Sequence, residues 1–169
     1  MNGHELLAAF EEAFDHSVVF HGFAEHLRDY DVFIYMSADP RSGIKPKYLR
    51  YRFTHCVLAT VKTAISPKTW ARSLDERLLH YDAAIESGVN GYVWGVNFHD
   101  LYPGISLVEE SGEAAAWGDR LGIPFYEARL ETNAQYLDLV FSDLVVTEVG
   151  EGFAPFVVPP EGSDQAGEG

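Results

Sequence analysis

The stretch KYLRYRFTHCVLATVKTAI, residues 47–65, decides how the rest of the chain is interpreted. Apolar side chains occupy alternate positions for most of its length, whereas Arg50, Arg52 and Lys62 fall on the opposite side. Because successive side chains of a strand point to opposite faces, this alternation predicts one long half-buried β-strand, or two strands joined by a bulge. The apolar positions are Leu49, Tyr51, Phe53, Val57, Ala59, Val61 and Ile65.

The same region is basic within an acidic chain. Residues 41–74 contain eight Lys or Arg and no Asp or Glu, whereas the whole chain has a formal charge of −14, so the remaining residues sum to −22. Opposite charges on neighbouring strands stabilise each other, which predicts acidic strands on at least one side of the basic strand. The carboxylates expected beside Arg50 and Arg52 are those of Glu127, Glu131 and Asp138.

Length and composition indicate one packed domain. The chain has 169 residues, of which 47% are hydrophobic, so one core can bury roughly two-thirds of the unfolded surface. We assign residues 1–158 to this domain and expect the acidic, Gly-rich tail at 159–169 to be disordered, because it lacks large apolar anchors. Cys56 has no partner for an intramolecular disulfide, no charged-then-apolar leader opens the chain, and no apolar run approaches the roughly 20 residues of a membrane-spanning helix. A cytoplasmic protein without membrane contact is expected.

Spacing and turn chemistry predict the other elements. Helices are indicated by amphipathic spacing, by the capping boxes that begin at Ser73 and Ser106, and by Gly88 and Gly122 as stops. Residues 17–22 fit either a brief strand or a turn, and strand 30–38 should form a hairpin with the basic strand. The expected helices cover 3–16, 73–88 and 106–121, and the other expected strands cover 92–98, 125–131, 136–148 and, as an edge strand, 153–158.

This order of elements predicts an α+β fold in a single domain. Strands outnumber helices, and neighbouring strands are joined by turns rather than by helices. We therefore expect a largely antiparallel sheet of about five to seven strands, with two or three helices packed mainly on one face.

Histidines are the main candidates for chemistry. His99 and Asp100 follow an expected strand and enter a loop, where together with Tyr102 they could form a general acid–base site. A metal could be held by His21 and His26, but their five-residue spacing does not suit ligands on one helix face, so we predict no metal and no cofactor. The chain lacks GxSxG, GxxxxGK[ST], GxGxxG and CxxC motifs.

Several segments resemble the YxiG-like proteins, a family of small bacterial proteins of unknown activity. They are HSVVFHGFAEHLRDYDVFIY, DPRSGIKPKYLRYRFTHCV, GYVWGVN and LETNAQYLDLVF, within residues 5–147. The resemblance supplies no catalytic residues, and it implies an association with toxin and immunity genes.

Two hypotheses of function follow. In the first, the chain is a non-enzymatic acidic protein that binds a basic protein partner, such as an immunity-type inhibitor that binds a toxin. In the second, it is a small metal-assisted or general acid–base hydrolase that uses His99, Asp100 and either His21 or His26. Nucleic acid is not an expected partner, because the acidic surface repels phosphate.

Overall fold

The structure is a computed structural model that describes residues 1–73, 86, 99–150 and 152–156. The expected strand at 92–98, the expected tail at 159–169 and nearly all of the expected helix at 73–88 lie outside the described residues. Before that helix, α2 (Pro67–Ser73) begins at the proline that follows Ser66, a position that favours proline because its backbone nitrogen needs no helical partner.

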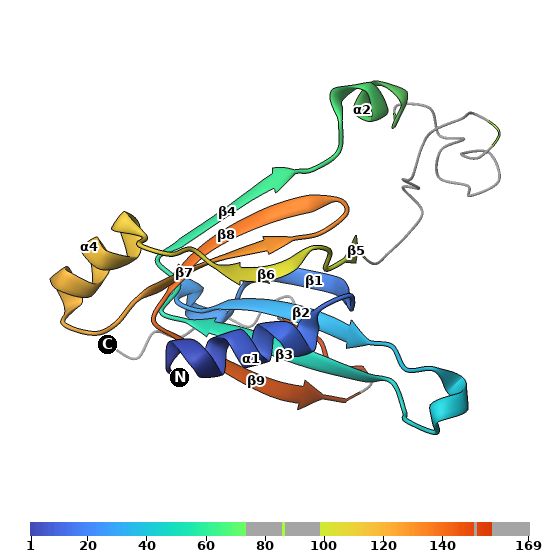
Figure 1. Cartoon of the computed structure of the whole chain (residues 1–169), viewed down its shortest axis with the longest axis horizontal. Helices are drawn as coiled ribbons and strands as arrows, with labels where there is room; N and C mark the ends of the chain where they lie inside the picture. The colour runs from blue at the N-terminus through green and yellow to red at the C-terminus, as the bar shows by residue number, and fades with distance from the viewer. Residues whose placement is uncertain (74–85, 87–98, 151, 157–169) are drawn as a thin grey trace, which may run out of the picture.

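The described strands form two antiparallel sheets rather than the single sheet of five to seven strands that we expected (Figure 1). The first sheet has the order β5-β1-β2-β3-β9, and the second has the order β4-β8-β7-β6. The α+β class and the antiparallel pairing are confirmed. The strands are β1 (Ser17–Phe23), β2 (Tyr30–Met36), β3 (Lys47–Thr54), β4 (Leu58–Thr63), β5 (His99–Asp100), β6 (Gly104–Leu107), β7 (Tyr126–Glu131), β8 (Gln135–Phe141) and β9 (Asp143–Val149).

Strand β3 shows the alternation that its sequence predicts. Leu49, Tyr51 and Phe53 are buried, while the arginines between them lie on the half-exposed face. The expected hairpin with β2 is present, and its turn contains the short helix η2 (Pro40–Ser42). Gly43 ends that turn with a φ of 70°, a conformation that costs glycine little.

Residues 47–65, expected as one long strand or as two strands joined by a bulge, form two strands that belong to different sheets. They meet at a corner, which we define as residues 54–57 and 140–143. His55 has a φ of 48°, which interrupts the extended backbone between β3 and β4. The expected strand 136–148 divides at the same place, because Ser142 separates β8 from β9. The two crossings are bonded together: Ser142 N donates to Thr54 O at 3.0 Å, and Val57 N donates to Val140 O at 2.9 Å. Strands that switch sheets in this way form the corners of packed sheets.

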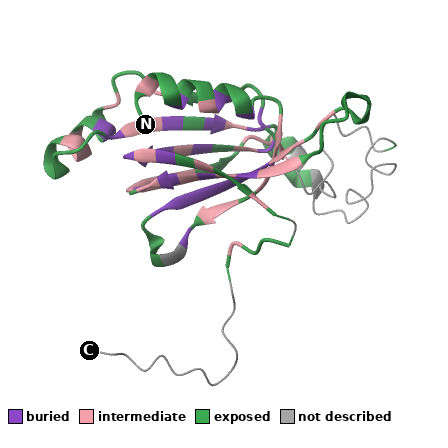
Figure 2. Cartoon of the chain, turned by 90° about the horizontal axis from the view of Figure 1, so that it is seen from below, coloured by how far each residue is buried: buried purple, intermediate pink, exposed green. Residues whose placement is uncertain are grey.

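One hydrophobic core lies between the inner faces of the sheets (Figure 2). The Phe53 ring of the first sheet meets the Phe141 ring of the second edge to face, with ring centres 4.8 Å apart. Helix α1 (Gly3–Ala13) contributes Leu6 and Phe10 to the same core. Full burial of one such side chain stabilises the fold by about 1.5–3 kcal/mol, so the sheets and α1 depend on one another.

Helices α1 and α4 (Gly112–Leu121) lie in different places rather than on one face. Helix α4 packs outside the second sheet, where Ala114 meets Phe125 and Val140, whereas α1 packs against the core between the sheets. The expected helix start at Ser106 is wrong, because residues 104–107 pair with β7 as a strand and Ser111 caps the helix instead.

The described part of the edge strand expected at 153–158 is not a strand, and residues 157–158 lie outside the described residues. Residues 153–156 form no strand, although the Phe153 ring lies 5.6 Å from the ring of Phe33. Among the described residues, no helix is long and apolar enough to cross a membrane.

Candidate functional site

The first candidate site is a polar cluster between the sheets, centred on His21. Its Nδ1 lies 2.7 Å from the Tyr30 hydroxyl, and its Nε2 lies 3.0 Å from the side-chain oxygen of Gln135. An amide oxygen only accepts, so Nε2 of the neutral ring carries the proton and Nδ1 accepts from Tyr30. His21 therefore joins β1 and β2 of the first sheet to β8 of the second.

His99 lies on β5, which pairs with β1 and places His99 opposite Val18, three residues before His21. Burial lowers the pKa of His99 below its ordinary value, and the nearby His21 lowers it further. The hydrolase hypothesis combined His99 with either His21 or His26, and the structure brings it near His21. The lowered pKa favours the neutral imidazole, which is the form that accepts a proton as a general base.

The other sequence-predicted site residues make contacts elsewhere. Asp100 Oδ1 accepts a hydrogen bond from Ser17 Oγ at 2.7 Å, and the exposed Tyr102 ring lies 6.1 Å from the Phe14 ring of α1. His26 is exposed in the short helix η1 (Glu25–Leu27). Within the described part of the chain, no group of three His, Cys, Asp or Glu could hold a metal ion.

The second candidate site is the arginine pair of β3 on the outer face of the first sheet. Asp31 of β2 lies opposite Arg52, and it accepts from Arg52 Nε at 3.0 Å and from Arg50 Nη2 at 2.6 Å. The Asp31 side chain is only 3% exposed. The expected neutralisation of the basic strand across a neighbouring strand is therefore present, with one carboxylate shared by two arginines.

The three carboxylates expected to neutralise β3 lie on the second sheet instead. Asp138 accepts from Arg129 at 2.7 Å, and Glu127 accepts from the Ser111 hydroxyl. Glu131 lies on β7, opposite Tyr136 of β8. Charge alone suggested these residues as partners, whereas the actual partner follows from the register of the β2–β3 hairpin.

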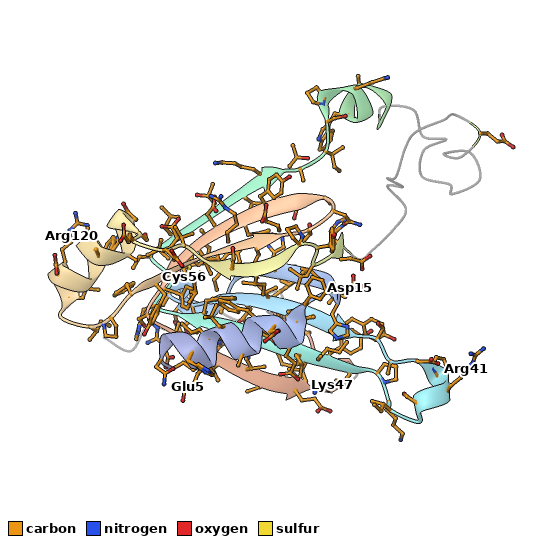
Figure 3. All side chains as sticks on the ribbon, viewed as in Figure 1. Glu5, Asp15, Arg41, Lys47, Cys56 and Arg120 are labelled. Carbon is orange, nitrogen blue, oxygen red and sulfur yellow. The ribbon has the colours of Figure 1, made fainter. Side chains whose placement is uncertain are left out.

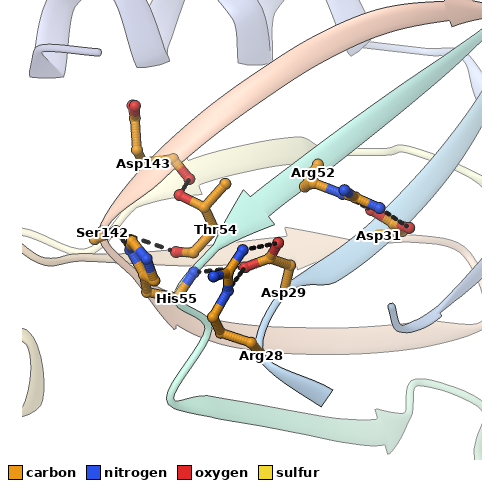
Figure 4. A network of polar contacts seen from close by, with 8 residues as sticks. All are labelled: Arg28, Asp29, Asp31, Arg52, Thr54, His55, Ser142 and Asp143. Carbon is orange, nitrogen blue, oxygen red and sulfur yellow. Dashed lines mark hydrogen bonds and ion pairs between the residues drawn. The ribbon is translucent and has the colours of Figure 1, made fainter. Parts of the chain in front are cut away.

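A second polar network, centred on Asp29, lies next to the Asp31–Arg52 pair and reaches the corner (Figure 4). The Arg28 guanidinium donates twice to Asp29, at 3.1 and 3.2 Å, and the backbone N–H of His55 donates at 3.0 Å. His55 Nδ1 lies 2.7 Å from Ser142 Oγ, which links the network to the second crossing strand. Asp29 thus helps to hold His55 in its left-handed conformation.

Asp29 and Asp31 are both buried, but their pKa values move in opposite directions. Burial raises the pKa of Asp31, and the hydrogen bond and charge of Arg52 offset this only in part. Burial also acts to raise the pKa of Asp29, but the bonds from Arg28 and His55 and the charges of Arg28 and Arg52 together hold it below its ordinary value. At Asp29, hydrogen bonds and nearby positive charges therefore outweigh the effect of burial on the pKa.

A sequence model of the YxiG-like protein family matches residues 2–159. The chain belongs to this family. The match spans all nine described strands and extends beyond the residues that carried the resemblance. No curated protein matches the chain significantly.

Sequence reasoning missed three residues of these sites. Asp31 could have been found, because a hairpin between strands 30–38 and 47–65 places an acid near the basic strand. Tyr30 and Gln135 gave no such signal, because their contact with His21 depends on how the two sheets pack.

Proposed function

We propose that the chain is a non-enzymatic binding protein that recognises a basic protein partner through its acidic surface, as an immunity-type inhibitor binds a toxin. The net charge of −14 supports a basic partner, because the summed charge steers association with molecules of opposite sign. Membership of the YxiG-like family is compatible with this role but does not specify it.

Many of the described basic side chains are engaged within the fold. Arg28, Arg50, Arg52 and Arg129 each pair with an aspartate, and Lys47 lies 3.6 Å from Glu12. Arg120 lies over the Trp117 ring, 5.2 Å from its centre. Each of these ion pairs offsets one carboxylate, and of those named here only the Lys47–Glu12 pair involves α1.

The exposed side of α1 is the observation that carries the proposal. It presents the carboxylates of Glu5, Glu11 and Glu12, and Asp15 follows just after the helix end. Glu5 and Asp15 lie near opposite ends of this helix, so the acidic residues extend along its length (Figure 3). We call these four residues the acidic face of α1.

The test compares two variants with the same change in charge. One neutralises α1 (Glu11→Gln, Glu12→Gln, Asp15→Asn), and the control neutralises exposed acids at α4 (Glu109→Gln, Glu110→Gln, Asp119→Asn). Against a Lys- and Arg-rich peptide selected for binding to the wild type, the α1 variant should lose about tenfold in affinity, equivalent to about 1.4 kcal/mol. The control should lose less than about threefold. Equal losses, or failure to select any basic peptide, would contradict the proposal.

The closeness of His21 and His99 favours the hydrolase as a second candidate function. Hydrolysis of p-nitrophenyl acetate that is lost in His99→Gln, but kept in the exposed control His4→Gln, would support it. A chelator should leave the melting temperature unchanged if the chain is a binding protein, because a bound metal stabilises the folded state by mass action. A drop that a divalent ion reverses would favour the metal-assisted hydrolase.

A reducing cytoplasm suits the proposed binding protein. Cys56 is a free, buried cysteine, and burial raises the pKa of its thiol to about 12. Such a thiol has little nucleophilic thiolate at neutral pH, so we assign Cys56 a packing role.

A further inference from the structure

A groove runs between α1 and β6, on the side of the helix that carries Leu7, Glu11 and Phe14. These residues recur at spacings of four and three, so they share one helix face. The groove has a volume of about 470 Å³. Its lining comprises Leu7, Phe10, Glu11, Phe14, Pro103 and Ile105, and we call it the α1–β6 groove.

The α1–β6 groove leaves large apolar side chains in water. Leu7 is 52% exposed and Phe14 is 49% exposed, and the Phe14 ring contacts the Tyr102 ring, which is 64% exposed. A contiguous apolar strip of this kind marks an interaction surface more often than a scattered exposed residue does. The strip extends from the middle of α1 to the loop before β6.

The backbone of β6 lies close to the Phe14 ring at Gly104. Gly104 has a φ of 117°, and a side-chain carbon there would lie 3.3 Å from the Phe14 ring. Glycine therefore lets this ring lie against the strand in a conformation that other residues rarely adopt.

Carboxylates border the apolar strip. Glu11 belongs to the groove lining, and Asp15 follows one residue after Phe14. Both carboxylates are exposed, so a cation that approaches the groove meets negative charge beside apolar surface.

We propose that the α1–β6 groove receives one apolar side chain of a basic partner segment, whose flanking Lys or Arg residues meet Glu11 and Asp15. This inference rests on the proposed function and adds the chemistry of the partner's anchor. The carboxylates favour a basic segment, and the apolar lining favours a Leu or Phe side chain as the anchor. Protein interfaces commonly combine a buried apolar centre with a polar rim in this way.

Two synthetic peptides, KGKFKGK and KGKAKGK, test the groove because they have equal charge and differ only in the central side chain. The Phe peptide should bind the wild type about tenfold more tightly than the Ala peptide, measured by calorimetry at low salt. In the variant Leu7→Ser with Phe14→Ser, this difference should disappear. The control Leu121→Ser with Ile123→Ser alters apolar residues that are 53% and 41% exposed at α4, and it should keep the difference.

The experiment gives different results if the groove proposal is wrong and if the proposed binding function is wrong. The wild type could bind both peptides with equal affinity, and the variant that neutralises α1 could bind neither. That result would contradict the groove proposal and support the proposed binding function. No affinity for either peptide would contradict both proposals. Light scattering that shows a dimer broken by Leu7→Ser with Phe14→Ser would instead assign the groove to a second copy of the chain. Circular dichroism of each variant, with an unchanged spectrum expected, separates lost binding from lost folding.

Discussion

The outer faces of the two sheets each carry an arginine–aspartate cluster, and the two clusters differ in burial. On the first sheet, Asp31 is 3% exposed and is shared by Arg50 and Arg52. On the second sheet, Asp138 is 16% exposed and pairs with one arginine, Arg129, whose side chain is 49% exposed. The Arg50 and Arg52 side chains are 20% and 31% exposed. Both the carboxylate and its arginines are thus less exposed on the first sheet than on the second.

Burial decides how much each cluster matters. An exposed pair gains little, because water screens the attraction and two flexible side chains must be ordered. A buried carboxylate has lost its hydration, so the arginines that face it are strongly required once it is there. The number of ion pairs in this chain is therefore a poor guide to its stability, and the location of each carboxylate is a better one.

Asp31→Asn should give the largest effect, because it leaves two partly buried guanidinium groups without their shared acceptor. We expect a loss of about 2–4 kcal/mol in the free energy of unfolding, which is less than for a fully buried pair since both arginines keep some solvent. Urea denaturation measures it, and an unchanged slope would show that the unfolded state is unaffected. A loss below about 0.5 kcal/mol would show that Asp31 contributes no more to stability than the exposed Arg129–Asp138 pair does.

The double substitution Arg50→Gln with Arg52→Gln should have the next largest effect, about 1–2 kcal/mol. The cost is smaller than for Asp31→Asn because burial already raises the pKa of Asp31, so the orphaned carboxyl can take up a proton. Adding Asp31→Asn to this double variant should cost little more, and the non-additivity in a mutant cycle measures the coupling within the cluster. Additive losses would mean that the three residues act independently.

Asp29→Asn should change stability by about 1–2 kcal/mol and should also change its pH dependence. The folded pKa of Asp29 lies below its ordinary value of 3.8, so its stabilisation is present above that value and is lost as the pH falls through the folded pKa. The variant should therefore lose stability less steeply in acid than the wild type does. Asp31 has the opposite shift, so Asp31→Asn should steepen the acid slope. Denaturation curves between pH 7 and pH 3 compare the two, and parallel curves would contradict both signs.

The pair on the second sheet should give the smallest effect. Replacing Arg129 by Gln and Asp138 by Asn should alter the free energy of unfolding by less than about 1 kcal/mol, and added salt should shrink the difference. A larger loss that persists in salt would show that exposure is a poor measure of the worth of an ion pair in this chain.

Local pattern predicted the strands well and their non-local partners poorly. Alternation identified β3, and the turn that ends at Gly43 identified its hairpin with β2, because both depend on neighbouring residues. The division of residues 47–65 between two sheets was not foreseen, although His55 interrupts the apolar alternation at the place where the chain bends. Nothing near His99 in sequence indicates that β5 pairs with β1, so its closeness to His21 required the structure.

The corner also has a consequence for how the chain folds. The bonds between Thr54 and Ser142 join residues 88 positions apart, so closing this contact requires a long loop of chain to come together first. The two segments that cross there each supply one strand to each sheet, so the contact lies between the β3–β9 and β4–β8 pairings. Long-range pairing of this kind slows folding, so we expect closure of the corner to be a slow step that brings both sheets together.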